Sequence, residues 1–348
     1  MSDGPRLVVH TAPFLRQGIT TPGLMRDVLY ALVPVLATAV WYFGLSAVLV
    51  VAAATAGAVG AERLFGRRGS LGDASAVLTG VILGLILPPG IPMWMAFVGG
   101  AMGIGLGKLV WGGLGHNLFN PALVGRAFLQ AAFPTALTTW PVPAGLPGLR
   151  ASNFALPFLQ SAPPAPQGAL HAAADGLTGA TPLNLMKFEH EAASLADLLR
   201  GNVAGSLGET SAAVIVLAGV WLALRRAFDW RIPVSILLSV AVLSGVLWAI
   251  DPGAYPSPLF MLLSGGLLFG AVFMATDPVS SPLAPRGAWI FGSGIGVLVV
   301  LIRIWGGLPE GVMYAILLMN AATPLLERVD QPRAFGRAGA PAARRRPT

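Results

Sequence analysis

Long apolar segments separated by short polar, glycine or proline breaks occupy most of the chain. A helix needs roughly 20 apolar residues to cross the hydrocarbon core of a membrane, and ten segments approach that length. No period-two alternation appears, and lipid offers the backbone no hydrogen-bond partner, so we expect helices. Their approximate ranges are 27–44, 45–62, 73–88, 91–109, 120–137, 211–226, 232–250, 257–276, 287–304 and 308–326. The pattern predicts an all-α integral membrane protein with about ten transmembrane helices.

The composition supports this class and excludes several others. Of the 348 residues, 55% are apolar and only 11% are charged, whereas soluble domains carry roughly 25% charged residues. The mean hydropathy of +0.73 also excludes a disordered chain. Because the chain has no cysteine, it has no disulfides, thiolate iron–sulfur ligands or thiol chemistry, and four scattered histidines predict no metal site.

The distribution of positive charge predicts the orientation of the spans. Segment 1–26 lacks the apolar stretch of a secretory signal, and with ten spans both termini face one side. That side receives seventeen Lys and Arg residues, whereas the long loop 138–210 on the other side carries only Arg150, Lys187 and Arg200. The bias predicts cytoplasmic termini and an outer, periplasmic loop. The expected organisation is an N-terminal segment 1–26, a first half 27–137, the loop 138–210, a second half 211–326 and a basic tail 327–348.

A short repeat suggests that the two halves are related. Trp-Gly-Gly-Leu occurs at 111–114 and at 305–308, and Pro88 and Gly100 map onto Pro282 and Gly294 with the same offset of 194. Chance in a low-complexity membrane sequence is one explanation. The other is two homologous halves of five helices each, which would be inverted relative to one another because five is odd. Inverted repeats with broken helices near the midplane are typical of transporters, and Pro88 and Pro278 mark such breaks.

Familiar catalytic and nucleotide-binding motifs are absent. Gly103 to Lys108 superficially resembles a phosphate loop, but its spacing is wrong, Leu109 stands where Ser or Thr belongs, and no strand precedes it. No Gly-x-Gly-x-x-Gly opens a βαβ unit, so nicotinamide binding by this chain is not expected. We expect no catalytic residue in this chain alone.

One motif in the outer loop does indicate chemistry. Asp175-Gly176-Leu177-Thr178-Gly179-Ala180-Thr181 reads, at its simplest, as a pair of turns. It also resembles the signature of the covalent flavin subunits of the Rnf complex and of the sodium-translocating NADH:quinone reductase. The resemblance implies that the Thr181 hydroxyl is joined to the phosphate of FMN by a phosphoester bond, which a flavin transferase forms outside the membrane. It assigns Asp175, Gly176, Thr178, Gly179 and Ala180 to the surrounding flavinylation motif.

The resemblance extends over nearly the whole chain. Segments 115–125, 201–211, 275–280 and 319–322 are similar to the corresponding parts of that family. The first span starts within about 27 residues of the N-terminus, which favours the Rnf type over the quinone reductase, whose subunit has a longer extension. The Pro- and Ala-rich run 157–174 departs from the family pattern but leaves the motif intact.

The resemblance also implies a second, noncovalent flavin. In the family, asparagines before the fifth span help to hold riboflavin near the cytoplasmic side, and Asn117 and Asn120 match them. Their i, i+3 spacing would place both amides on one face of a helical turn. The alternative is that Asn120 simply caps the helix that Pro121 begins.

The resemblance and the expected topology together imply a function. The chain would be a membrane electron-transfer subunit of an ion-translocating ferredoxin:NAD oxidoreductase in the bacterial inner membrane, where electron transfer is coupled to Na⁺ or H⁺ movement. The implied partners are Rnf subunits A, B, C, E and G, the flavin transferase and membrane lipid, with no nucleic acid. The rival functions are a channel or transporter without a redox role and a membrane scaffold for redox partners.

Ionisable residues near span ends are further candidates. Asp277 and Glu209 lie close to predicted span ends, and for Asp277 a turn and a functional role are equally compatible with the pattern. Glu209 has a possible role in capping the sixth span.

Overall fold

The computed structural model describes residues 20–67, 69–143, 145–146, 148–157, 179–189, 193–308 and 310–329. Within these ranges the chain is helical and contains no extended β-strand. The first half contains α1 (Thr21–Phe43), α2 (Leu45–Phe65), η1 (Ser70–Asp73), α3 (Ser75–Leu85), α4 (Met93–Ile104), the π-helical η2 (Gly105–Leu109), α5 (Pro121–Ala132) and α6 (Pro134–Thr138).

The loop and the second half contain the remaining elements. They are η3 (Ala151–Phe154), α7 (Pro182–Asn184), the π-helical η4 (Leu185–Glu189), α8 (Leu195–Arg200), η5 (Leu207–Glu209), α9 (Ala212–Leu224), α10 (Arg231–Ile250), α11 (Pro258–Leu263), α12 (Leu267–Phe269), the π-helical η6 (Gly270–Met274), α13 (Pro285–Trp305) and α14 (Val312–Val329).

Four helices are long and apolar enough to cross a membrane: α1, α2, α10 and α13. Shorter apolar helices cover Ser75–Leu85, Met93–Leu109 and Ala212–Leu224. Large apolar side chains such as Trp41, Leu217 and Ile250 are about 70% exposed on the outside of the bundle. Since a soluble monomer rarely exposes so much apolar surface, these faces suit lipid or partner helices, and the chain is an integral membrane protein.

The helices follow the expected ranges, with three differences that local chemistry explains. Helix α1 begins at Thr21 rather than near 27, because Thr20 caps it and accepts a hydrogen bond from Gly23 N. The expected span 120–137 breaks at Phe133, since a residue before proline avoids the helical conformation. The expected span 257–276 breaks between α11 and α12, where Gly265 has a φ of +62°.

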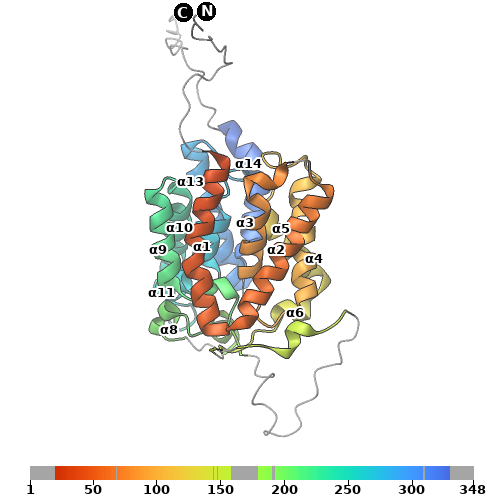
Figure 1. Ribbon diagram of the computed structural model, residues 1–348. Helices are drawn as coiled ribbons and strands as arrows, with labels where there is room; N and C mark the ends of the chain where they lie inside the picture. The colour runs from red at the N-terminus through yellow and green to blue at the C-terminus, as the bar shows by residue number, and fades with distance from the viewer. Residues whose placement is uncertain are drawn as a thin grey trace, which may run out of the picture.

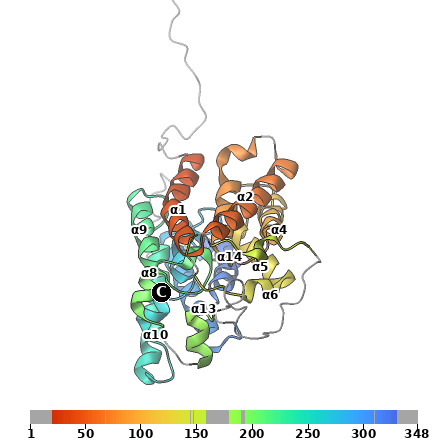
Figure 2. The same cartoon turned by 60° about the horizontal axis from the view of Figure 1, so that its bottom comes forward.

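Helix packing divides the bundle into two groups. In the first half α2 packs against α3 and α4, and α4 packs against α5. In the second half α10 packs against α11 and α13, and α13 packs against α14, while α1 lies against α9. Viewed from the end that carries α6, helices α9 and α10 lie on one side and α2, α4 and α5 on the other (Figure 2).

Close approach of the helices depends on small residues. A Cβ added at Gly100 of α4 would lie 2.1 Å from the carbonyl oxygen of Ala54 in α2. A Cβ at Gly292 of α13 would lie 1.7 Å from Ser235 Oγ in α10. These glycines allow backbone contact between helices, as is typical of packing within a membrane.

The described chain starts and ends at the same end of the bundle. The start of α1 and the end of α14 lie at the top of Figure 1, and α6 and α8 lie at the opposite end. The core lies where the broken helices meet: Leu85, Ile86, Leu87, Leu207 and Phe269 are all at most 1% exposed. This arrangement places the breaks inside the bundle, where their freed backbone groups need partners.

Candidate functional site

Buried arginines hold the backbone at both helix breaks. At the end of α3, Arg126 of α5 donates from Nη1 to the carbonyl oxygen of Ile86 over 2.6 Å. At the end of α11, Arg303 of α13 donates to the carbonyl oxygens of Met261 and Ser264, over 2.6 and 2.9 Å. Each arginine therefore satisfies carbonyls that a broken helix leaves without an internal partner.

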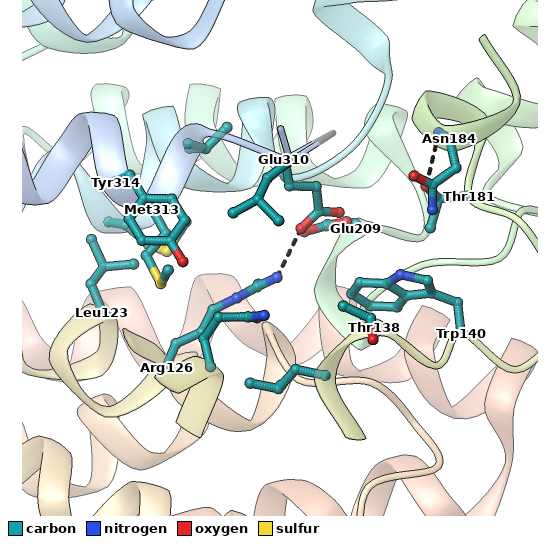
Figure 3. A pocket seen from close by; sticks show the side chains of 16 residues that line it. Leu123, Arg126, Thr138, Trp140, Thr181, Asn184, Glu209, Glu310, Met313 and Tyr314 are labelled. Atoms are coloured by element: carbon teal, nitrogen blue, oxygen red, sulfur yellow. Dashed lines mark hydrogen bonds and ion pairs between the residues drawn. The ribbon is translucent and has the colours of Figure 1, made fainter. Parts of the chain in front are cut away.

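Two glutamates lie beside these arginines. Glu310, just before α14, accepts a hydrogen bond from Arg126 Nη2 at 2.8 Å, and the two side chains are 19% and 10% exposed. Glu209, at the end of η5, interacts with the carboxyl group of Glu310. Figure 3 shows Arg126, Glu310 and Glu209 pointing toward one another. The expected capping role of Glu209 is wrong, because the Ser211 hydroxyl caps α9 instead.

The environment of Glu209 favours a protonated carboxyl group. Burial and the negative charge of Glu310 raise the pKa of Glu209 to about 8, against smaller opposing effects of Arg126 and of the Ser206 hydroxyl. Glu209 nevertheless keeps some accessible surface, because it lines a cavity. A carboxyl group of this kind can gain or lose its proton near neutral pH.

That cavity, here called the Thr181 cavity, has a volume of about 200 Å³. One water needs roughly 10–15 Å³ on the same measure, so the space is large enough for a ligand. Residues from five segments line it: Leu123, Arg126, Gln130, Leu137, Thr138, Trp140, Thr181, Asn184, Glu209, Gly266, Met274, Leu308, Glu310, Val312, Met313 and Tyr314. Its walls are mostly apolar. In Figure 3 the arginine and the two carboxyl groups lie between Met313 and Tyr314 on the left and Trp140 and Thr181 on the right.

Thr181 lies at the edge of the cavity and is 3% exposed. Its hydroxyl caps the short helix α7 by accepting a hydrogen bond from Asn184 N at 3.2 Å, with Pro182 at the first helical position. Before it, Gly179 N donates to the carbonyl oxygen of Trp140, and a Cβ at Gly179 would lie 2.9 Å from Val142 Cγ2. The small residue therefore allows the strand-like segment before Thr181 to lie against 140–142.

The structure describes only part of the expected motif. Gly179, Ala180 and Thr181 are described, and Ala180 is exposed. Asp175, Gly176 and Thr178 lie outside the described residues. Their assignment to the flavinylation motif therefore remains a prediction.

A second cavity, here called the Asn117 cavity, lies at the opposite end of the bundle and has a volume of about 60 Å³. It is lined by the start of α1, by η6, by the segment before α5 and by the segment after η6. Asn117 and Asn120 both line it, as do Lys108 and Asp277. The structure thus brings the two predicted asparagines to one cavity.

The two asparagines do not share a helical turn, so that part of the expectation is wrong. Asn120 is extended, with φ −63° and ψ 120°, because Pro121 follows it. The alternative that Asn120 caps α5 is confirmed: its Oδ1 accepts from Ala122 N at 2.9 Å, and its Nδ2 donates to the carbonyl oxygen of Met274 at 3.1 Å. Asn117 differs, because its buried Oδ1 has no hydrogen-bond partner within the described ranges.

A buried ion cluster borders the Asn117 cavity. Lys108, in the π-helical η2, is 2% exposed and donates to Glu62 Oε1 at 2.6 Å and to Ser75 Oγ at 2.5 Å. Asp73 Oδ2 lies 3.6 Å from its ammonium nitrogen. The lysine thus lies among two carboxylates and a hydroxyl, which together compensate its burial.

Asp277 closes a turn at the same end. Its carboxylate accepts hydrogen bonds from Val279 N at 3.2 Å and from Ser280 Oγ at 3.0 Å. Burial raises its pKa, and these two hydrogen bonds partly oppose the increase. The expected turn at Asp277 is present, and the same residue also lines the Asn117 cavity.

The sequence analysis missed the Glu310–Arg126 pair and the Lys108 cluster. Arg126 stands inside an apolar segment, and an ionisable residue in a span is a functional candidate by default. That signal could have identified Arg126. Nothing in the sequence indicates its partner Glu310, which lies 184 residues away along the chain.

Comparison with known proteins identifies the family. Residues 8–336 match the family described as the NQR2, RnfD, RnfE family. The chain belongs to that family. It is 43% identical over 332 residues to the D subunit of the ion-translocating oxidoreductase complex of Stutzerimonas stutzeri, covering 90% of this chain and 92% of the relative.

Two further members of the NQR2, RnfD, RnfE family carry more specific names. The D subunit of the Na(+)-translocating ferredoxin:NAD(+) oxidoreductase complex of Acetobacterium woodii is 37% identical, with 95% of each chain covered. The D subunit of the proton-translocating ferredoxin:NAD(+) oxidoreductase complex of Clostridium ljungdahlii is 36% identical, with 94% of this chain and 96% of the relative covered. Two relatives with nearly the same sequence identity to this chain are thus named for different ions.

Proposed function

We propose that this chain is the D subunit of an Rnf-type ion-translocating ferredoxin:NAD oxidoreductase complex and that it carries FMN covalently on Thr181. The names of relatives 36–43% identical over most of their lengths support the subunit and the complex. The chain acts as a membrane electron-transfer subunit of a translocase and is not catalytic alone.

The observation that carries the cofactor proposal is the placement of Thr181 at the edge of a cavity of about 200 Å³. The residues fit a flavin: a threonine hydroxyl for the phosphoester, small Gly179 and Ala180 before it, and Trp140 and Tyr314 among the lining residues. FMN supplies one-electron and two-electron redox chemistry when bound, and the protein positions it and limits water.

The membrane arrangement that we propose has about ten transmembrane helices in two inverted five-helix repeats. The packing of α2 on α3 and α4, and of α4 on α5, has a counterpart in α10 on α11 and α13, and α13 on α14. Both described ends lie at one end of the bundle (Figure 1), and the charge bias assigns that end to the cytoplasm of a bacterial inner membrane. The long flavin-bearing loop 138–210 then faces the periplasm.

Orientation can be tested directly because the chain has no cysteine. A single cysteine placed at Ala180, which is exposed, should react with a membrane-impermeant thiol reagent added to whole spheroplasts. A single cysteine at Arg225, at the end of α9, should react only after the cells are opened. The reverse result would overturn the orientation.

The proposed partners are Rnf subunits A, B, C, E and G, with a flavin transferase needed for maturation and lipid around the bundle. NADH and ferredoxin react on the cytoplasmic side, so a flavin at the outer face requires electrons to cross the membrane and return. Because relatives are named for Na⁺ and for protons, the coupled ion is either of these two.

A second flavin, noncovalent riboflavin, is proposed for the Asn117 cavity. Asn117 supports this proposal, because a buried acceptor oxygen without a protein partner suits the ring N–H of a flavin. Asn120 contributes indirectly, since its amide is occupied by the cap and by Met274.

The alternative function is a channel or transporter with an inverted repeat and no redox role. Broken helices with buried polar groups would suit it equally well. The names of the relatives do not favour it, and it does not account for the motif that ends at Thr181.

Intact mass of the purified chain, after co-expression with a flavin transferase, tests the covalent flavin. The wild-type chain should gain the mass of one FMN less water, and Thr181→Ala should not. Thr139→Ala, at an exposed threonine of the same loop outside the motif, serves as the matched control and should keep the added mass. Thr181→Ser should also accept flavin because it keeps a hydroxyl. A wild-type chain without added mass would overturn the cofactor proposal and favour the transporter.

A further inference from the structure

Glu209 differs from Glu310, the other acid that lines the Thr181 cavity among the described residues, in having no cation of its own. Arg126 gives one nitrogen to the carbonyl oxygen of Ile86 and the other to Glu310. Arg303 gives two nitrogens to the carbonyl oxygens of Met261 and Ser264. Among the described residues no ion pair within 4.0 Å joins Glu209 to a basic side chain. The helix breaks therefore occupy the arginines that would otherwise pair with it.

The surrounding backbone is shaped to admit this carboxyl group. Gly266 stands beside it, and a Cβ there would lie 2.5 Å from Glu209 Oε1. The preceding Gly265, with a φ of +62°, would place a Cβ 3.2 Å from Arg303 Nη2. Two glycines at the break of the helix thus leave room for an acid and an arginine that do not pair with each other.

The carboxyl groups of Glu209 and Glu310 lie at the border between two cavities. Glu209, Glu310 and Thr181 line the Thr181 cavity, and the same three residues line a smaller cavity of about 10 Å³. This smaller space, which is bounded by 203–206, has room for about one water. It lies on the side of the loop that precedes α9, so it connects the carboxyl pair to the outer segment.

We infer that Glu209 and Glu310 form a proton-holding pair that keeps one proton at neutral pH and that, at alkaline pH, binds this proton when an electron enters the Thr181 cavity and releases it when the electron leaves. This inference rests on the proposed flavin at Thr181. The electron comes from a one-electron donor of the iron–sulfur class in a partner subunit. The proton comes from a water molecule on the outer side: one O–H bond of the water breaks, one O–H bond forms at Glu209, and hydroxide passes to the outer solvent. In the reverse step the electron departs and the proton returns to hydroxide.

The physical reason is charge compensation. A negative charge placed in a cavity of low dielectric repels a neighbouring carboxylate strongly, so protonation of that carboxylate becomes more favourable. The charged groups that face Glu209 are Glu310, Arg126 and Arg303. Because burial raises its pKa and Glu310 raises it further, to about 8, the carboxyl group is largely protonated at neutral pH, and an added negative charge changes its protonation at alkaline pH.

The first test needs no flavin and therefore does not depend on the proposed function. Infrared spectra of the full-length Thr181→Ala chain in lipid nanodiscs should show a protonated carboxyl band at neutral pH that disappears at alkaline pH. Glu209→Gln on this background should remove that band, whereas Glu189→Gln, at an exposed acid of the same loop, should leave it. A wild-type spectrum without the band, or a band that sodium displaces at fixed pH, would overturn the pair as a proton site.

The second test uses the flavinylated chain in its complex. At alkaline pH the midpoint potential of the Thr181 flavin should shift with pH by up to about 59 mV per tenfold change in proton concentration, the value for one proton per electron. Glu209→Gln should flatten this dependence, and Glu189→Gln should not. An unchanged slope in Glu209→Gln would place the proton on the flavin itself and refute the inference. If the mass of the chain shows no attached flavin, the proposed function is refuted. The infrared test would then still show whether Glu209 and Glu310 hold a proton.

Discussion

The two cavities lie at opposite ends of the bundle, and each adjoins buried charges that are arranged differently. Beside the Asn117 cavity, one cation, Lys108, is surrounded by Glu62, Ser75 and Asp73. Beside the Thr181 cavity, Arg126 donates to a backbone carbonyl and to Glu310, Arg303 donates to two backbone carbonyls, and Glu209 has no described ion pair within 4.0 Å. The first arrangement is a closed ion cluster, and the second keeps one acid free to titrate.

The difference shows that buried charge has two uses in this protein. A lysine that is paired within a buried cluster fixes the packing of α2, η1 and η2. An acid whose arginine neighbours are occupied by a helix break responds instead to any charge placed in the adjacent cavity. Substitutions in the Lys108 cluster should therefore change mainly the stability, whereas substitution of Glu209 should change mainly the dependence of stability on pH.

The largest expected effect is loss of stability in Lys108→Met. The substitution leaves Glu62, whose side chain is 0% exposed, as a buried charge without a cation, which costs about 3–5 kcal/mol in the free energy of unfolding. Chemical unfolding in detergent micelles measures the change.

The matched control for Lys108→Met is Arg225→Met, which breaks the more exposed ion pair with Asp27 and should cost less than about 1 kcal/mol. The double variant Lys108→Met, Glu62→Gln should recover much of the loss. If Lys108→Met and Arg225→Met cost the same free energy of unfolding, the buried ion cluster would contribute no more to stability than an exposed ion pair does.

A smaller effect should separate the two asparagines. Asn120→Ala removes the cap of α5 and should cost about 1 kcal/mol. It also removes the bond to Met274 that joins the two halves, so noncovalent flavin should fall. Asn117→Ala loses the hydrogen bond from Nδ2 to the Phe119 carbonyl oxygen but no cap, and its Oδ1 has no protein partner, so it should cost less stability than Asn120→Ala and yet lose the flavin.

Noncovalent flavin can be counted by fluorescence after denaturation, with the covalent flavin removed by Thr181→Ala. Unchanged noncovalent flavin in both asparagine variants would refute the second flavin site. Loss in Asn120→Ala alone would indicate that the effect passes through the cap rather than through a ligand contact.

The sequence was sufficient for features that depend on local chemistry. Asn120 followed by Pro121 predicts a capped helix start, and the structure has that cap. Pro88 predicts a break after α3, which ends at Leu85. The same reasoning failed for the turn 117–120, where helical spacing was assumed although Pro121 disfavours a helical conformation at Asn120.

The sequence was not sufficient for features that depend on distant partners. Lys108 and Glu62 are 46 residues apart, and Arg126 and Glu310 are 184 apart, so no local pattern connects them. Three π-helical segments also have no sequence signal, yet one of them places Lys108 in its cluster. Arg126 is the exception that could have been flagged from its apolar surroundings.

The smallest expected effect at neutral pH is that of Glu209→Gln. Below its pKa of about 8 the Glu209 carboxyl is already largely protonated, and an amide of similar shape replaces it with little change in stability. Between its ordinary pKa and about 8, the folded protein binds a proton that the unfolded chain has lost, so the free energy of unfolding falls as pH rises. Glu209→Gln lacks this proton and should lose that part of the slope.

The wild-type and Glu209→Gln chains should therefore have similar thermal midpoints at neutral pH in detergent, and the variant should become relatively more stable as the pH becomes alkaline. Glu189→Gln, at an exposed acid, should follow the wild-type curve throughout. A pH profile of Glu209→Gln that parallels the wild type would mean that Glu209 is ionised in the folded protein at neutral pH. In that case Glu209 would hold no proton at neutral pH, and the proton-holding pair would be refuted.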